Sequence, residues 1–266
     1  MKFSIIVVCL NPGEKLNQTL DSILDQTFAD YEIIVKDGKS RDGSIERMRQ
    51  DRRIRFFSEE DRGIYDAMNQ AVSHVQGDFV LFLNCGDKFY HNKVLEQTAA
   101  VIEREEHPEN LVLYGDTYSE KSGVMISSPP KITGLVCYRN IPCHQSCFYA
   151  ARLCREKPYE ESYRIRADYD HFLWCRYKAG AKMVYLNMPV SAYEGGGYSE
   201  SRENQKRDKE EHRQITKKYM SGAELFSCRL FMLCTLAPLR RLLAENQWSS
   251  GIYHWFKEQL YRRKLP

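Results

Sequence analysis

Residues 59–87 read EEDRGIYDAMNQAVSHVQGDFVLFLNCGD, and this stretch contains the pattern that decides the fold. It opens with a polar turn, continues through a helical pattern at residues 64–75, and then enters the apolar run DFVLFLN at residues 78–84. The run ends in a glycine-containing turn that carries Asp87. An apolar strand that follows a helix and ends in a polar turn is typical of an α/β sheet.

The same alternation of strands and helices extends to both sides of this stretch. Further strands are expected at residues 3–9, 31–36, 54–58, 111–116 and 182–187, and further helices at residues 14–26, 43–49, 94–105 and 168–179. Strands that are apolar throughout are typical of a parallel sheet, because helices cover both of its faces. We therefore expect a mostly parallel, Rossmann-like α/β sheet flanked by helices, with ligands at the carboxyl ends of its strands.

The composition is that of an ordinary globular protein. Of the 266 residues, 42% are hydrophobic and 28% are charged, which excludes collagen-like, coiled-coil and low-complexity classes. At roughly 150 residues per domain, this length allows one large domain with a tail. The net charge of +3 is too small a basic surplus for a nucleic-acid partner. Nine cysteines without a C-x-x-C pair indicate reduced thiols and a cytoplasmic protein.

The C-terminal part differs from the rest in charge. Residues 213–266 contain 10 Lys and Arg against 3 Asp and Glu, or +7, which leaves −4 for residues 1–212. The segment LFSCRLFMLCTLAPLRRLL, at residues 225–243, mixes apolar and basic side chains in the manner of a helix at an anionic membrane surface. The alternative is that this segment packs on the catalytic domain or forms a homodimer contact. No apolar stretch reaches the roughly 18 uncharged residues of a membrane-spanning helix.

Two aspartates stand at the carboxyl ends of predicted buried strands. Asp37 follows YEIIVK and precedes Gly38, so its carboxylate can accept hydrogen bonds from a nucleobase or ribose, while capping of a following helix is the alternative. Asp87 suits Mg²⁺ or Mn²⁺ bound to a diphosphate, because these cations take oxygen ligands and commonly use one or two carboxylates plus substrate phosphates. A surface turn at Gly86 is the alternative for Asp87.

A dense polar set lies between these aspartates, where a helix opens near residue 64. Its members are Asp61, Arg62, Gly63, Asp66 and Asn69. Polar groups at a helix N-terminus suit an anionic ligand, and Arg62 can contact a diphosphate. Capping and a solvated surface are the alternative explanation.

Four blocks taken together resemble the family-2 glycosyltransferases, which have the GT-A fold and use nucleotide-sugar donors. The blocks are SIIVVCLN at residues 4–11, QTFADYEIIVKDGKSRDGS at 26–44, the stretch at 59–87, and IRADYDHFL at 165–173. Together with PCHQSCF at residues 142–148, they are most similar to bacterial enzymes that assemble exopolysaccharides such as colanic acid. The resemblance implies a GT-A catalytic domain at residues 1–200, with a nucleotide-sugar half at 1–90 and an acceptor half at 91–200, and a helical tail at 201–266.

The resemblance also implies a role for individual residues. Asp168 matches the catalytic base, Asp87 matches the last aspartate of the Asp-x-Asp-like metal motif, and Asp37 matches the nucleotide contact. The other nucleotide-sugar contacts that it implies are Asn11, Gly38, Asp61, Arg62, Gly63, Asp66, Asn69 and Asn84, and the acceptor or diphosphate contacts are His144, Gln145 and Asp170. In Asn84-Cys85-Gly86-Asp87, Cys85 replaces the first acid of the motif.

Two of these assignments have an alternative. Asp170 competes with Asp168, but two residues along a helix correspond to a turn of about 200°, so only one of them can face the cleft, and we favour Asp168. His144 is either a structural histidine or a contact to metal or diphosphate.

The resemblance therefore implies a metal-dependent, inverting glycosyltransferase with Mg²⁺ or Mn²⁺ as cofactor. The expected donor is a UDP- or GDP-linked sugar, and the expected acceptor is a hydroxyl of a lipid-linked glycan in surface polysaccharide (exopolysaccharide or lipopolysaccharide) biosynthesis. The tail would hold the enzyme peripherally at the cytoplasmic, inner face of the bacterial inner membrane.

Other functions compete with this one. A nucleotidyltransferase would need a glycine-rich phosphate loop where CLNPGEKLNQ has a single glycine, and a nicotinamide oxidoreductase would need G-x-G-x-x-G there. A non-catalytic glycan- or nucleotide-binding protein on a decayed transferase fold is the third alternative. Retention of Asp37, Asp87 and Asp168 argues against decay.

Overall fold

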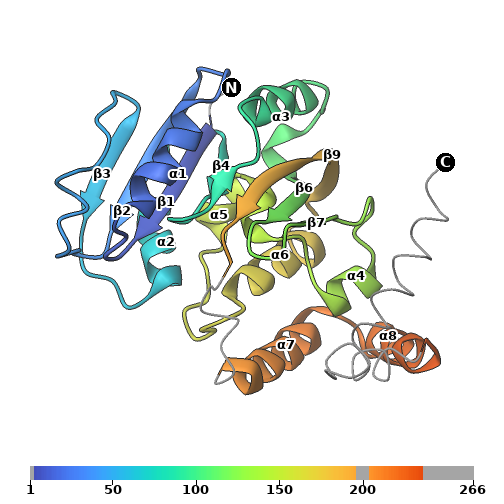
Figure 1. The fold of residues 1–266 in the computed structure, drawn as a ribbon. Helices are drawn as coiled ribbons and strands as arrows, with labels where there is room; N and C mark the ends of the chain where they lie inside the picture. The colour runs from blue at the N-terminus through green and yellow to red at the C-terminus, as the bar shows by residue number, and fades with distance from the viewer. Residues whose placement is uncertain (1–2, 196–203, 236–266) are drawn as a thin grey trace. The chain divides into compact units, whose positions relative to one another are not determined.

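The computed structural model describes residues 3–195 and 204–235 (Figure 1). The chain divides into two compact units, Met1–Tyr219 and Met220–Pro266. The first unit contains the sheet and helices α1 to α7, of which α4 spans Gly134–Arg139, and helix α8 (Gly222–Cys234) belongs to the second.

The first unit is built on one mixed sheet with the strand order β3-β2-β1-β4-β8-β6-β9-β5, and β7 pairs with β6. The strands are β1 (Phe3–Cys9), β2 (Tyr31–Asp37), β3 (Ile54–Ser58), β4 (Phe79–Phe82), β5 (Lys88–Phe89), β6 (Leu111–Ser119), β7 (Val124–Ile126), β8 (Cys147–Ala150) and β9 (Lys182–Tyr193). Strands β1 to β4 run parallel, and β8 runs antiparallel to both β4 and β6. The predicted α/β sheet, mostly parallel, is confirmed.

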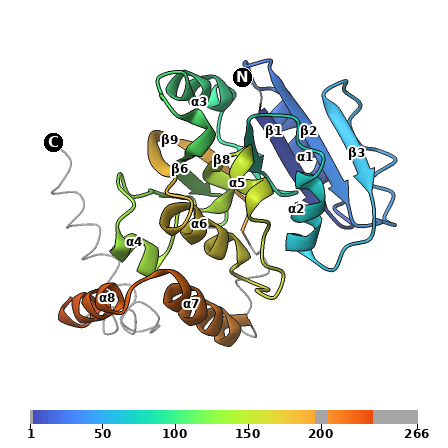
Figure 2. The same ribbon diagram turned by 180° about the vertical axis from the view of Figure 1, so that it is seen from behind.

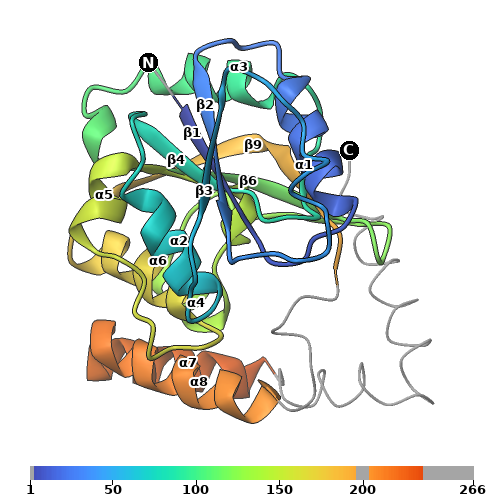
Figure 3. The same cartoon turned by 90° about the vertical axis from the view of Figure 1, so that its left-hand side faces the viewer.

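Helices cover both faces of this sheet (Figure 2; Figure 3). Helices α1 (Lys15–Leu24) and α3 (Val94–Ile102) lie on one face, and α2 (Ile64–Val72), α5 (Ala151–Glu156) and α6 (Ala167–Tyr177) lie on the other. Helix α1 buries Leu16, Leu20 and Ile23, whose spacing places them on one side of the helix. Because both faces are covered, β1, β2 and β4 are buried along their whole length, as their apolar sequences predict.

The direction of β8 determines which residues meet at one edge of the sheet. Strand β6 is antiparallel to β8 and parallel to β9, so β4, β6 and β9 end at the same edge. The 3₁₀ turn His144–Ser146 comes directly before β8 and therefore lies at that edge as well. The turn after β4 and Glu194 after β9 complete the edge.

Helix α7 (Gln205–Tyr219) packs against the segment that leads into α6. The carboxylate of Glu211 accepts backbone N–H groups from Arg164, Ile165 and Arg166 at 2.9, 3.0 and 2.9 Å. From the sequence we assigned this helix to the tail at 201–266, whereas it groups with the sheet in the first unit. Residues 201–203 and 236–266 of the predicted tail lie outside the described residues.

The helix that we expected at residues 43–49 is absent, and the segment forms successive turns. The N–H groups of Arg47 and Met48 donate to carbonyls three residues earlier. Asn17 of α1 donates to the carbonyl of Arg47 and accepts the N–H of Arg49, both at 2.9 Å. This tertiary contact uses the backbone groups that a further helical turn would need, so the prediction was wrong.

Helix α8 exposes four large apolar side chains. They are Phe226, Leu230, Phe231 and Leu233, whereas Leu225 and Cys228 are buried. Within the described ranges, no helix combines the length and apolar character that crossing a bilayer requires.

Candidate active site

A cavity of about 350 Å³ lies at the edge of the sheet where β4 and β9 end. Its lining comes from the start of α1, the start of α2, the turn after β4, the 3₁₀ turn before β8, the start of α6 and the end of β9. Among the predicted site residues, Asn84, Asp87, His144 and Asp168 line it. The structure thus brings together the residues predicted as base and as metal ligand.

Asp168 is held from two sides. The hydroxyl of Tyr65 donates to its Oδ1 at 3.0 Å, and Nδ1 of His144 lies 3.5 Å from its Oδ2. The other ring nitrogen of His144 lies 3.2 Å from the side-chain nitrogen of Asn84. These contacts orient the carboxylate in the cavity.

The contact between Asp168 and His144 sets the charge of both groups. Burial would raise the pKa of Asp168, but the hydrogen bond and charge of His144 lower it below its ordinary value. Burial would lower the pKa of His144, but Asp168, with Asp87, raises it. The pair therefore favours an ionised Asp168 carboxylate, the form that a general base requires.

Asp170, the competing candidate for the base, does not line this cavity. Its side chain is fully buried, and Nζ of Lys157 and Lys218 lie 3.1 and 2.8 Å from its two oxygens. The turn of about 200° between the two positions accounts for this separation.

Asp87 is a buried carboxylate with few partners. It is 6% exposed, its Oδ1 accepts the N–H of Glu194 at 3.3 Å, and it forms no ion pair with lysine or arginine in the described part of the chain. Burial raises its pKa to about 6. A carboxylate that is desolvated without a cation of its own fits a site for a divalent metal.

The neighbouring residues would supply few further metal ligands. Burial raises the pKa of Cys85 to about 12, so its thiol stays neutral and does not replace the missing acid. Residues 3–195 and 204–235 contain no group of three or more His, Cys, Asp or Glu side chains placed to hold a metal ion. A cation at Asp87 would therefore need oxygen ligands from a bound substrate or from water.

The predicted nucleotide contact Asp37 ends β2 and is 2% exposed. Its carboxylate accepts the hydroxyl of Ser58 at 2.7 Å and the N–H of Ser40 at 3.1 Å. Ser40 also accepts the N–H of Asn11 at 2.7 Å, which joins the ends of β1 and β2. Asn11 and Asp37 are therefore parts of one loop system.

Gly38 and Asp61 are in direct contact beside Asp37. A Cβ atom on Gly38 would lie 2.6 Å from Oδ2 of Asp61, so only glycine permits this approach. Nζ of Lys36, a side chain 1% exposed, lies 3.3 Å from the same oxygen. Asp37, Gly38 and Asp61, with Lys36, form what we call the β2 cluster.

Three other residues that we predicted as ligand contacts do not face the cavity, because they bond to the protein itself or are buried. Asp66 accepts the N–H of Arg62 at 2.8 Å at the start of α2, and Asn69 exchanges hydrogen bonds of 2.9 and 2.8 Å with the backbone of Tyr159. Gln145 is 3% exposed. None of these residues lines the cavity around Asp168.

A second cavity of about 600 Å³ adjoins the first, because both are lined by Ile64, Tyr65 and Arg164. Arg62, Gly63 and Asp66 contribute to the second cavity. The guanidinium of Arg164 donates to the carbonyl of Arg62 at 3.1 Å and pairs with no carboxylate among the described residues. A cation thus stands between the two cavities.

Comparison with known proteins identifies the family. The family model "Glycosyl transferase family 2" matches residues 4–132. A PGL/p-HBAD biosynthesis glycosyltransferase of Mycobacterium tuberculosis is 34% identical over 204 residues, which cover 74% of this chain and 78% of that protein. The chain belongs to glycosyltransferase family 2. A putative teichuronic acid biosynthesis glycosyltransferase of Bacillus subtilis, TuaG, is 33% identical over 106 residues, or 38% of this chain and 42% of TuaG.

Solved structures share the fold of this family-2 glycosyltransferase. S. aureus TarS 1–349 in complex with UDP-GlcNAc matches with a TM-score of 0.62 and 20% identity over 81% of this chain and 66% of that chain. The mannosyltransferase PcManGT from Pyrobaculum calidifontis, in complex with GDP-Man and Mn²⁺, matches with a TM-score of 0.61 and 14% identity over 95% and 83% of the two chains. The GT-A fold is thereby confirmed.

Several residues of the cavity in this glycosyltransferase were not predicted from the sequence. They are Lys15, Ile64, Tyr65, Arg164, Ile165, Tyr193 and Glu194. Tyr65 lies in the stretch that decides the fold, and its position one turn from Asp61 and Arg62 was the available signal. No spacing in the sequence relates Lys15 to Glu194.

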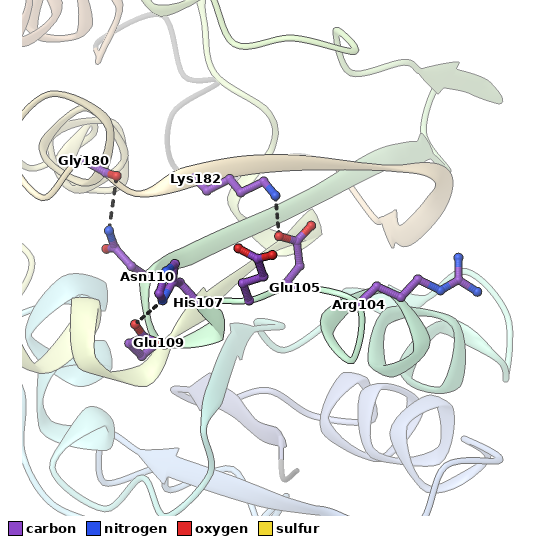
Figure 4. Close-up of a pocket in the computed structure, with 8 residues that line it drawn as sticks. Arg104, Glu105, His107, Glu109, Asn110, Gly180 and Lys182 are labelled. Carbon is purple, nitrogen blue, oxygen red and sulfur yellow. Dashed lines mark hydrogen bonds and ion pairs between the residues drawn. The ribbon is translucent and has the colours of Figure 1, made fainter.

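A further cavity of about 550 Å³ lies at the opposite edge of the sheet, beside the amino ends of β6 and β9 (Figure 4). Its polar groups bond to one another: Lys182 pairs with Glu105 at 2.5 Å, and Asn110 donates to the carbonyl of Gly180 at 3.2 Å. Ligands of open α/β sheets bind at the carboxyl ends, so this cavity is not the active site of the glycosyltransferase.

Proposed function

We propose that this family-2 glycosyltransferase transfers a sugar from a nucleotide-diphosphate sugar to a hydroxyl of a lipid-linked glycan, with inversion at the anomeric carbon. The observation that carries the proposal is the cavity in which an ionised Asp168, oriented by Tyr65 and His144, shares one space with Asp87. A base and an anchor for the leaving group are the two functions that this reaction requires.

The residues of the cavity explain where the proton of the acceptor hydroxyl goes and why the anomeric carbon is inverted. The acceptor oxygen attacks the anomeric carbon while the bond from that carbon to the diphosphate breaks, and its electron pair leaves with the diphosphate. Asp168 takes the proton of the acceptor hydroxyl, which requires the carboxylate to be ionised, as its lowered pKa indicates. Attack from the side opposite the leaving group in one displacement inverts the anomeric carbon.

Asp87 is the residue of this chain that would hold Mg²⁺ or Mn²⁺, together with oxygens of the donor's diphosphate. When bound, such a cation neutralises the charge that develops on the departing diphosphate. The Mn²⁺ and GDP-Man in the PcManGT structure support this assignment.

The β2 cluster would receive the nucleotide, with Asp37 accepting hydrogen bonds from the base or ribose, Asn11 beside it after β1, and Asn84 further along the edge after β4. UDP-GlcNAc in TarS and GDP-Man in PcManGT support a UDP- or GDP-linked donor. The PGL/p-HBAD and teichuronic acid biosynthesis named for the relatives supports a glycan acceptor. The cavity between Arg62 and Arg164 adjoins the base and offers space for that acceptor.

A binding panel tests the proposed donor. UDP, GDP and their hexose conjugates, each with and without Mn²⁺, are added to the full chain, and the midpoint of thermal unfolding is measured. A ligand at 100 times its Kd stabilises the folded state by about 2.7 kcal/mol, which is a shift of about 5–10 °C for a chain of this size. We expect either the uridine or the guanosine compounds to raise the unfolding midpoint by this amount, and to raise it further when Mn²⁺ is present. No shift with any member would contradict the proposal.

We also propose that the tail attaches the enzyme to the cytoplasmic face of the inner membrane. The exposed Phe226, Leu230, Phe231 and Leu233 of α8, with the +7 charge of residues 213–266, suit an anionic lipid surface.

Sedimentation with vesicles that contain anionic lipid tests this attachment. We expect the full chain to sediment at low salt and to be released by high salt, and the double variant Phe226→Ser, Leu230→Ser to remain largely in the supernatant. Val124→Ser, which alters an exposed apolar residue of β7, is the matched control and should sediment like the parent. A parent chain that stays in the supernatant at low salt would refute the attachment, and a homodimer detected by analytical ultracentrifugation would then explain the apolar face.

A further inference from the structure

Lys15 and Glu194 form an ion pair within the cavity, although they are 179 positions apart in the sequence. Lys15 is the first residue of α1, and Glu194 directly follows β9. The Nζ and Oε2 atoms lie 2.7 Å apart. Asp87 and Asp168 line the same cavity, so this pair stands beside the proposed reaction centre.

Gly86 creates the space in which the Glu194 carboxylate lies. Its φ is +102°, and a Cβ atom there would be 2.5 Å from Oε2 of Glu194 and 3.6 Å from Cδ of Lys15. Any other residue would displace the carboxylate from this position. Glu194 therefore contacts the backbone of the turn that carries Asp87, and its own N–H donates to Oδ1 of Asp87 at 3.3 Å.

The positive charge of Lys15 can bind a phosphate group in place of the Glu194 carboxylate. The hydrogen bond from Lys15 to Glu194 raises the pKa of Lys15, and Asp87 adds to the effect, so the ammonium stays charged. The exposed fractions of the two side chains are 53% and 38%, and an exposed ion pair contributes little to stability. An anion with more charge than a carboxylate can therefore replace Glu194 at Lys15 with little loss of folding stability.

We propose that Lys15 binds the diphosphate of the donor, and that Glu194 stays paired with Lys15 until the donor displaces it. This inference rests on the proposed function, because it places the diphosphate beside Asp87. A lysine is a common binder of phosphate oxygens, which accept short, charge-assisted hydrogen bonds. A negative Glu194 at the same lysine opposes the incoming diphosphate by charge repulsion, so donor binding must move it.

Calorimetric titration of three full-length proteins tests the inference. The parent, Lys15→Met and Glu194→Gln are titrated with UDP and GDP, and with uridine and guanosine as probes that lack phosphate. We expect Lys15→Met to raise the Kd of the bound diphosphate about tenfold or more. We expect Glu194→Gln, which keeps the shape and removes the charge, to lower that Kd about two- to fivefold. The Kd of the nucleoside should not change in either variant.

Three further variants separate binding from damage to the fold. Lys15→Arg should restore most of the diphosphate affinity, because a guanidinium also binds phosphate. Lys182→Met and Glu105→Gln remove a comparable ion pair at the other end of β9 (Figure 4) and should leave every Kd unchanged.

Two results would overturn the inference while leaving the proposed function intact. One is an equal loss of affinity for nucleoside and diphosphate in Lys15→Met, and the other is weaker diphosphate binding in Glu194→Gln. A parent chain that binds neither UDP nor GDP would instead contradict the proposed function, and this inference with it.

Discussion

Replacing Asp168 with asparagine is expected to lower the rate of sugar transfer by about two to four orders of magnitude, with little change in donor affinity. Asparagine keeps the shape of the side chain and can still bond to Tyr65, but it cannot take the proton of the acceptor hydroxyl. Release of nucleoside diphosphate from the donor sugar measures the rate, and titration with the same donor measures the affinity.

Asp170→Asn is the matched control for this prediction, because it makes the same change two residues along α6. It leaves Lys157 and Lys218, which are partly exposed, facing a buried neutral amide, so we expect a loss of about 1–3 kcal/mol in the free energy of unfolding. The rate per folded molecule should be nearly that of the parent. If Asp170→Asn lost the activity and Asp168→Asn kept it, the base would be the other carboxylate.

Asp87→Asn is expected to abolish metal-dependent turnover and yet to stabilise the metal-free protein. Burial raises the pKa of Asp87 from 3.8 to about 6, so the folded state carries an unfavourable charge at pH 7. At about 1.4 kcal/mol per pKa unit, removing this charge should raise the free energy of unfolding in chelator by about 1–3 kcal/mol. The gain should be complete above about pH 6, shrink as the pH falls toward 3.8, and disappear below 3.8, where the carboxyl is protonated in both states.

Urea unfolding at pH 7 and at pH 4, in excess chelator, measures this gain. The parent enzyme should lose its activity in chelator and recover it with Mg²⁺ or Mn²⁺. Full activity of the parent in excess chelator would contradict the metal role of Asp87. A stable but inactive variant would show that the loss of turnover does not come from misfolding.

Much of the fold could be predicted because its parallel strands are continuous apolar runs. Strands β1, β2 and β4 are buried on both faces, so burial and sequence pattern agree. Strand β8 was missed, since four residues, CFYA, that follow a polar turn are too few to show a periodicity. Its antiparallel direction is nevertheless what brings His144 to the edge where Asp87 lies.

The candidate site was predictable only where a motif marks it. Asp87 and Asp168 stand in recognisable blocks, and the cavity contains both. Asn69 stands in a block as well, but its amide bonds to the backbone of Tyr159, which no motif reveals. Glu211 of α7 accepts backbone N–H groups from the segment before Asp168. The sequence of α7 is so rich in charged residues that it predicts an exposed helix, so this contact could not be foreseen.

The most direct test of the central claim is the release of nucleoside diphosphate from UDP- and GDP-linked hexoses, measured for the parent chain beside Asp168→Asn and Asp87→Asn. With water as a slow acceptor, this measurement needs no knowledge of the natural glycan. We predict release from at least one donor by the parent in the presence of Mn²⁺ and its near-complete loss in both variants. Release that is equal in all three proteins, or absent from the parent with every donor that it binds, would contradict the assignment of this cavity as the active site.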